Sequence, residues 1–460
     1  MADGSDEDKR VIPGPRPAAR LGNLKDIKPK AHLSWTEWCA EYGPVCRVDL
    51  GPLGDSVLLG NFDVIRKAFE DNSDAFSARF VLPIAEKDGT RGTMTWENNE
   101  VFDKRRELLT TVMKQVDIEK LARNEATAIC EVLNKNKDSS SDLVYRLMEE
   151  ANLNMISTFC FRREQRCPYD DPNFCELKKR IGEMNKKLKN LMAEPANLFP
   201  VLWVFYFGFR RARKNLRCLV GKELETHKET LDATSVRDLM DGYLTKAGGI
   251  EFPAEECLAN IMNLMGATIT LKNTFQWLLL LITKHPEVQT KIQDEVTSVF
   301  GDDTPTMANV DKLPYTNATI YETLRFACPA TQFVPHATQA DAKFEGYDIK
   351  KDTVVFANIW GPHRDAKYWD EPEKFNPDRF LDSEGKLDLN KESYIPFGLG
   401  KRRCPGETYA KNAMFIFLAN IYQRYGFQAV AGETLPDVAD GVINIGLHNP
   451  PPYNLKIVVR

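Results

Sequence analysis

The chain has 460 residues, of which 43% are hydrophobic and 28% charged, and its formal net charge is -5. This composition supports an extensive hydrophobic core, and the low net charge does not suggest a nucleic-acid partner. No composition shift, flexible linker or internal repeat divides the chain, so we expect one large domain over residues 13–460. The ten cysteines show no zinc-type spacing, which favours reduced thiols in a cytosol-facing protein.

The N-terminal residues 1–12 form a polar leader without an apolar run that could span a membrane or serve as a signal peptide. Residues 12–17 (IPGPRP) follow as a stiff, extended segment. Strand-like runs come next, at 45–50 and 57–59. Apolar residues at three- and four-residue spacing then predict helices over 117–133, 142–159 and 175–192.

A longer apolar segment extends from residue 253 to 282 and ends at His285-Pro286. Polar residues interrupt it too often for a transmembrane span, so we predict a buried central helix. Two further strand-like runs follow at 353–357 and 455–459. The pattern as a whole predicts a mainly α fold with small peripheral β-sheets.

One cysteine, Cys404, lies in a glycine-containing loop directly after three cations. Residues 397–406 read FGLGKRRCPG, so Gly400 and Gly406 flank the cysteine. Glycines let the backbone approach a flat ligand, and neighbouring cations favour a thiolate. Such a thiolate suits the axial ligand of a haem iron, with Arg402 on a haem propionate. The alternative is a surface loop with a free cysteine, against which five fixed positions in ten residues argue.

The complete pattern F-x-x-G-x-R-x-C-x-G resembles the signature of the cytochrome P450 family, and the likeness extends over residues 13–460 to the animal microsomal branch that oxidises drugs and steroids. It implies the cytochrome P450 fold, with a long central helix over haem b, the Cys404 thiolate on the iron, and Phe397 and Gly398 beside the cofactor. In microsomal members a proline-rich segment directly follows a membrane anchor. Either the anchor has been trimmed here, with the protein on the cytosolic face of the endoplasmic reticulum, or this member is naturally soluble and cytoplasmic. We favour the first interpretation.

The resemblance also implies cations that hold the haem propionates. His336 in the stretch FVPH and Arg79 in FSAR match such positions, and Arg105 or Arg106 resembles the basic end of a W-x-x-x-R helix motif. The tryptophan of that motif is absent, because valine and phenylalanine stand four positions earlier. Plain surface charge is the alternative for the two arginines.

Glu322 and Arg325 place an acid and a base three residues apart on one helix face. Alone, this E-x-x-R pattern usually indicates an exposed ion pair. The resemblance adds Arg379 from residues 375–380 (FNPDRF) and implies a buried network of the three that supports the haem-binding core.

Related monooxygenases carry [AG]-G-x-[DE]-T in the central helix, over the oxygen-binding face of the haem. The matching residues here are 266–270 (GATIT), so Thr270 retains the hydroxyl that relays protons, whereas Ile269 replaces the acid. Either water or a residue of another segment does the work of the acid, or the substrate is already oxygenated and needs no delivered protons.

An apolar stretch at 198–209 (LFPVLWVFYFGF) precedes the basic run RRARK. Aromatic residues beside cations suit a membrane surface, and in microsomal relatives this region roofs the active site and dips into the bilayer. An ordinary core segment followed by an exposed basic turn is the alternative.

A basic set on the expected thiolate side of the haem suits an acidic flavoprotein donor such as NADPH–cytochrome P450 reductase. The chain itself shows no flavin- or nicotinamide-binding glycine fingerprint. The set consists of Lys104, Arg105, Arg106, Lys114, Lys401 and Arg403.

The sequence therefore predicts a haem-thiolate monooxygenase that inserts one atom of O2 into an apolar small molecule (a steroid, fatty acid or xenobiotic), with Thr270 as the catalytic side chain. A hydroperoxide or endoperoxide isomerase or lyase that needs no reductase is one alternative, supported by Ile269. A non-catalytic haem or ligand carrier is another, against which Thr270 and the basic set argue. The substrate pocket is expected to include Gly266, Ala267, Ile269, Thr331, Val334 and Leu447.

Overall fold

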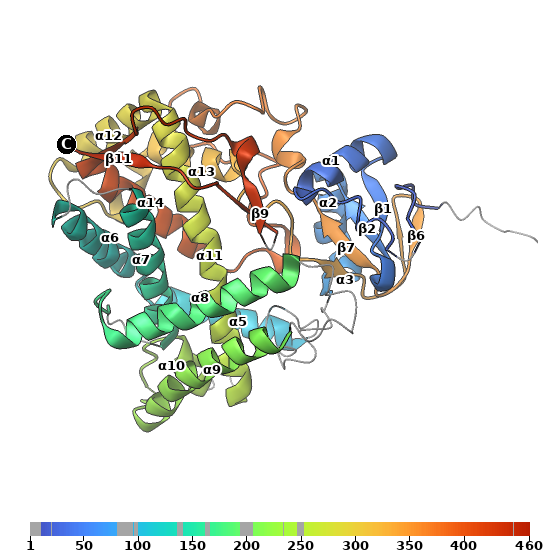
Figure 1. The fold of residues 1–460 in the computed structure, drawn as a ribbon, viewed down its shortest axis with the longest axis horizontal. Helices are drawn as coiled ribbons and strands as arrows, with labels where there is room; N and C mark the ends of the chain where they lie inside the picture. Colours follow the sequence, from blue (N-terminus) through green and yellow to red (C-terminus); the bar gives the residue numbers. More distant parts are fainter. Residues whose placement is uncertain are drawn as a thin grey trace, which may run out of the picture.

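The computed structural model describes residues 11–19, 21–80, 95, 100–135, 141–161, 166–193, 206–232, 234–245, 253–444 and 446–460. A helical body lies beside a smaller lobe that carries most of the sheet (Figure 1). The polar leader, apart from its last two residues, lies outside the described residues.

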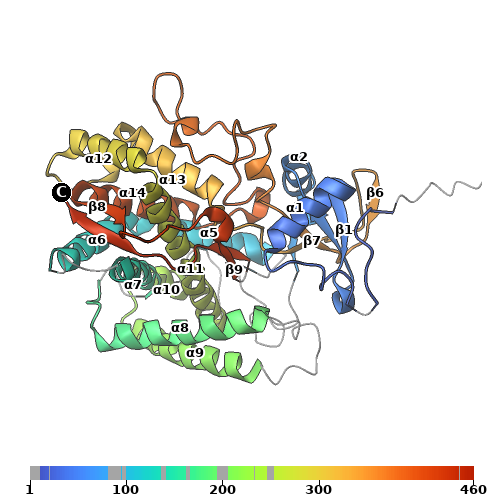
Figure 2. The same ribbon diagram turned by 45° about the horizontal axis from the view of Figure 1, so that its top comes forward.

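The α-helices of the described segments begin with three in the lobe, α1 (Ala31–Tyr42), α2 (Phe62–Arg66) and α3 (Ser73–Phe76). The body contains α5 (Glu100–Gln115), α6 (Ile118–Lys135), α7 (Ser141–Phe161), α8 (Pro172–Ala193), α9 (Tyr206–Glu229), α10 (Leu239–Leu244), α11 (Ala254–Lys284), α12 (Pro286–Phe300), α13 (Pro314–Phe326) and α14 (Glu407–Arg424). Helices α8 and α9 lie side by side (Figure 2).

The largest sheet of the described residues has the strand order β1-β2-β7-β4-β3. Its strands are β1 (Val45–Asp49), β2 (Asp55–Leu59), β3 (Ala78–Arg79), β4 (His336–Ala337) and β7 (Val354–Ala357). Strand β2 pairs with β7 in parallel, and the other neighbours are antiparallel. Three two-stranded sheets consist of β5 (Ala342–Phe344) with β6 (Tyr347–Ile349), β8 (Tyr425–Ala429) with β11 (Leu455–Val459), and β9 (Val442–Asn444) with β10 (Leu447–Asn449).

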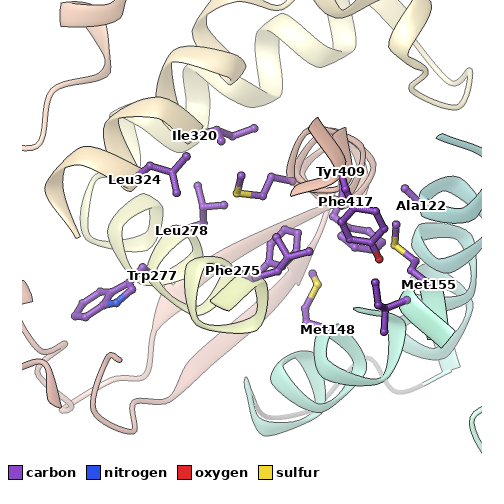
Figure 3. Close-up of a cluster of buried hydrophobic side chains, with 14 of the residues drawn as sticks. Ala122, Met148, Met155, Phe275, Trp277, Leu278, Ile320, Leu324, Tyr409 and Phe417 are labelled. Atoms are coloured by element: carbon purple, nitrogen blue, oxygen red, sulfur yellow. The ribbon is translucent and has the colours of Figure 1, made fainter. Parts of the chain in front are cut away.

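Helix α11 passes through the body as a continuous segment of 31 residues. It begins after Pro253 and ends at Lys284, because Pro286 disfavours helical geometry in the residue before it. Side chains buried in the core include Phe275 and Leu278 of α11, which face residues of α7, α13 and α14 (Figure 3). The rings of Phe275 and Phe417 meet edge to face with centroids 5.2 Å apart.

The structure confirms the predicted mainly α fold with small sheets, and each predicted helix and strand has a counterpart. It also confirms that the long apolar segment is a buried central helix. Among the described residues, no helix combines the length and apolar character needed to cross a membrane.

Candidate active site

The loop that carries Cys404 is shaped by two glycines with positive φ. Gly398 has φ of 79° and Gly400 has φ of 64°, values that other residues rarely adopt. A Cβ on Gly400 would lie 2.0 Å from the carbonyl oxygen of Phe69, so only glycine fits there. The Cys404 amide donates to the carbonyl of Phe397 at 2.8 Å, which closes the loop directly before α14.

The surroundings of Cys404 act on its thiol in two directions. Burial, with a smaller contribution from the Glu407 carboxylate, raises the pKa of the thiol above its usual value, whereas the Gly406 amide, Arg106 and Arg403 oppose this shift and favour the thiolate. The N-terminus of α14, at Glu407, adds a partial positive charge nearby. Part of the Cys404 surface is nevertheless accessible, so the sulfur is available to a ligand.

A second thiol, Cys328, also has a pKa raised by burial and opposed by two arginines, but it differs from Cys404 in lying within the core. Its sulfur donates to the carbonyl of Ala330 at 3.3 Å, and the residue is 1% exposed. Burial raises its pKa to about 12, so the proton stays on the sulfur. A thiolate ligand for iron is therefore better supplied by Cys404.

Three cationic or donor side chains from distant segments meet near this loop. Strands β3 and β4 pair Arg79 with His336, and Arg79 Nη1 lies 3.1 Å from the His336 ring nitrogens. Arg402 donates from Nε to the carbonyl of Ser77 at 2.9 Å, two residues before Arg79. The structure thus brings together Arg79, His336 and Arg402.

The pKa shifts within this cluster indicate whether the two negative charges of the haem propionates would be favourable beside it. Desolvation, followed by Arg402 and Arg106, lowers the pKa of Arg79 to about 9. Desolvation, Arg79 and Arg402 hold the pKa of His336 well below its usual range. Like charges gathered at a buried site favour an anion beside them, and the two propionates of a haem supply that charge.

Phe102 also contributes to this cluster, by contacting Arg402, and it was not identified from the sequence. It is 6% exposed, and the guanidinium carbon of Arg402 lies 3.7 Å from its ring centroid. The ring therefore holds Arg402 by a cation–π contact. The signal was present, because Phe102 stands four residues before Arg106, where the helix motif expects an aromatic donor.

Arg105 and Arg106 point to different surroundings, although both belong to α5. Arg105 is 5% exposed and forms an ion pair with Glu256 at the start of α11. The expectations that Arg105 is surface charge, or part of an exposed basic docking set, are therefore wrong. Arg106 is half-buried and is close enough to Cys404 and Arg403 for each to act on its pKa.

The E-x-x-R pattern forms a buried network rather than an exposed helix pair. Arg325 donates to both carboxylate oxygens of Glu322, at 2.7 and 2.8 Å, and both side chains are fully buried. Arg379 adds a bond of 3.1 Å to the same carboxylate. The remaining guanidinium hydrogens of Arg325 bond the backbone carbonyls of His363, Pro372 and Lys374, so the network joins α13 to the segment before the cysteine loop.

The middle of α11 has an open face although most of the helix is buried. Ala267 and Thr270 are exposed, and Gly266 has no atom within 4 Å of where a Cβ would lie. Residues three and four apart share a helix face, so these three border one space. The Thr270 hydroxyl donates to the carbonyl of Ala267 at 2.8 Å.

The remaining predicted pocket residues lie in segments that contact one another. Thr331 is buried and its hydroxyl lies 3.5 Å from the carbonyl of Gly446. Leu447 pairs with Ala330 through a β-bridge, which holds the β9–β10 hairpin against this segment. Val334 is 45% exposed, an unusual exposure for valine.

Most of the apolar stretch at 198–209 lies outside the described residues. Its described part starts α9, where Phe207 is 69% exposed and Phe209 packs partly against the core.

Comparison with known proteins gives matches over nearly the whole chain. A family model described as "Cytochrome P450" matches residues 12–457. Similar curated proteins include "Cytochrome P450 2C44" of Mus musculus, 31% identical over 98% of this chain and 94% of the relative. "Cytochrome P450 2C29" of Mus musculus is 32% identical over 98% and 94%, respectively. "Cytochrome P450 2H1" of Gallus gallus is 30% identical over 97% and 93%.

Proposed function

Because the chain belongs to the cytochrome P450 family, we propose that it is a reductase-dependent monooxygenase of apolar small molecules, with Cys404 as the axial ligand of its haem. The family resemblance, the enzyme class and a thiolate-ligated haem b are confirmed by the family match. The observation that carries the assignment to Cys404 is the thiol in its cationic, glycine-shaped loop beside the cluster of Arg79, His336 and Arg402.

Different residues of the chain hold different parts of the cofactor. Arg79, His336 and Arg402 bind the propionates, and Phe102 fixes the position of Arg402. Phe397 and Gly398 belong to the loop that covers the thiolate side. We assign no propionate contact to Arg105, because Glu256 holds it elsewhere.

When bound, the haem supplies dioxygen binding and activation. The open face of α11 supplies the space for substrate and a hydroxyl, that of Thr270, which can accept a proton and pass one on. Thr331, Val334 and Leu447 line the same pocket together with Ile269. These side chains are largely apolar, which suits a steroid, fatty acid or xenobiotic.

Electrons reach the protein from a flavoprotein reductase that docks on the thiolate side. Lys104 and Lys114 are exposed on α5, and Arg403 is exposed beside Cys404. Acids offset part of this charge, since Lys401 pairs with Asp74 at 2.9 Å and Arg403 with Glu407 at 2.6 Å. Steering by such a surface acts chiefly on the association rate and weakens with salt.

The protein acts at the cytosolic face of the endoplasmic reticulum, which residues 198–209 contact peripherally. The exposed ring of Phe207 supports this placement, because Arg210 and Arg211 follow it on the exposed side of α9.

The haem assignment is tested by the spectrum of the reduced protein with carbon monoxide. Cys404→Ala should lose the red-shifted Soret band of a thiolate-ligated haem, and Cys328→Ala should keep it. An unchanged band in Cys404→Ala, or its loss only in Cys328→Ala, would overturn the assignment.

The reaction class is tested by turnover under two conditions. Product formation should require the reductase and NADPH, and a lipid hydroperoxide alone should be rearranged poorly. Efficient rearrangement of the hydroperoxide without reductase would favour the isomerase or lyase alternative that Ile269 raises.

A further inference from the structure

The middle of α11 contains no acid, but a neighbouring helix brings one to it. Glu149 of α7 pairs with Lys272 of α11, with Oε2 and Nζ 2.6 Å apart. Lys272 lies two residues after Thr270 and three after Ile269, the position of the missing acid. The Lys272 side chain is 27% exposed and that of Glu149 50%, so the pair can exchange protons with solvent.

A second polar contact fixes how α7 lies along this part of α11. One turn further along α7, Asn152 donates from Nδ2 to the carbonyl of Thr268 at 2.7 Å. The contacts of Glu149 and Asn152 therefore fall on α11 residues four apart, one on each side of Ile269. These two contacts hold the Glu149 carboxylate at a defined position along α11 relative to the open face.

The path from Lys272 to Thr270 follows the circumference of α11. Viewed down the helix axis, with 3.6 residues per turn, the side chains follow one another in the order Lys272, Ile269, Gly266 and Thr270. The angles between successive side chains are about 60°, 60° and 40°. Gly266 has no side chain, and nothing lies within 4 Å of its would-be Cβ. Open space for water, which can bridge polar groups that are too far apart for a direct bond, therefore lies on the helix surface between Ile269 and Thr270.

We propose that Glu149, held by Lys272, is a positioning residue that replaces the missing acid and passes protons from solvent to Thr270 across Gly266. This inference rests on the proposed monooxygenase function. The carboxylate takes a proton from solvent and gives it to a water, and the water gives one to the Thr270 hydroxyl as that hydroxyl passes its own toward the oxygen-binding face. Each member accepts one proton and donates one, so none changes its charge over a cycle.

The test measures product formed per NADPH consumed by the holoenzyme with reductase. Glu149→Gln should reduce this ratio roughly tenfold or more, because general acid–base assistance typically contributes about 100-fold or more, and it should give more hydrogen peroxide and a larger solvent isotope effect. Glu149→Asp should retain part of the ratio. In the Glu149→Gln background, Ile269→Glu should restore the ratio.

A matched control is Glu255→Gln, which removes another ion-paired carboxylate attached to α11, at its start and paired with Arg217. It should leave the ratio unchanged. A readout independent of turnover is urea unfolding of Glu149→Gln, Lys272→Met and their combination. If the pair forms in solution, the double variant loses less stability than the two single losses added together.

Two results would overturn the inference: a coupling ratio in Glu149→Gln equal to that of the parent, or strictly additive losses in the unfolding cycle. Either would leave the monooxygenase assignment intact. An enzyme that forms no product with reductase and NADPH would instead refute the proposed function itself, and the proton route with it.

Discussion

Glu125 is a buried acid whose ionisation should make the stability of the protein depend on pH. It lies in α6 and is 2% exposed. Arg166 Nε lies 2.9 Å from its carboxylate and the Tyr169 hydroxyl donates to it at 2.6 Å. Burial outweighs both partners and raises the pKa of Glu125 from 4.5 to about 7.

The sign of the effect follows from linkage. Since the folded pKa exceeds the unfolded one, the folded state holds this proton more tightly, and the associated stability is fully present below pH 4.5. That stability is lost as the pH rises through 7. For these two pKa values the loss between pH 5 and 8 is about 2.5 kcal/mol, an upper estimate.

Glu125→Gln removes the titrating group while keeping its shape. Urea unfolding of both proteins at pH 5, 6, 7 and 8 should show that the free energy of unfolding of the variant, relative to that of the parent, rises by about 2 kcal/mol from pH 5 to pH 8. Tyr169→Phe should steepen the dependence of the parent, because it removes a hydrogen bond that lowers the pKa of Glu125. Parallel stability curves for the parent and Glu125→Gln would refute the reasoning.

Three further predictions concern the haem-binding core. Glu322→Gln leaves the buried guanidinium of Arg325 without its charged partner, and chemical unfolding should show a loss of about 3–5 kcal/mol; a loss below 1 kcal/mol would contradict the buried network. Gly400→Ala forces a Cβ against a backbone carbonyl at positive φ and should lower the haem content of the protein. The control Gly432→Ala also has positive φ but lies in open space, so it should keep its haem. Equal haem content in the two variants would contradict the packing argument. Phe102→Leu removes a cation–π contact of about 1 kcal/mol and should weaken haem binding about fivefold in a haem-transfer assay, and an unchanged affinity would show that Arg402 needs no such support.

Features encoded by neighbouring residues were predictable from the sequence. The periodicity within α11 and the proline after it specify a long buried helix, and the spacing of Gly400, Cys404 and Gly406 indicates the loop that we propose carries the haem ligand. Strands β3 and β4 have two residues each, too few to show alternation. The positions of Arg79 and His336 could therefore be predicted only from the family resemblance.

Contacts between distant residues account for what the sequence did not reveal. Arg105 and Glu256 are 151 positions apart, and Glu149 and Lys272 are 123 apart. Each of these side chains, taken alone, has the pattern of an ordinary charged helix residue. Only the packing of α5 and α7 against α11 decides which charges become buried or paired.

The order of strands in the main sheet has a consequence for synthesis of the chain. Strand β2 ends at Leu59, but its parallel neighbour β7 begins only at Val354. At about 5–20 residues per second, roughly 15–60 s separate the emergence of the two strands from the ribosome. For that time one edge of the β1–β2 hairpin has no partner from its own sheet. A nascent chain halted before Val354 should therefore recruit chaperones at this edge, and one halted far enough beyond Ala357 for β7 to have left the ribosome should not.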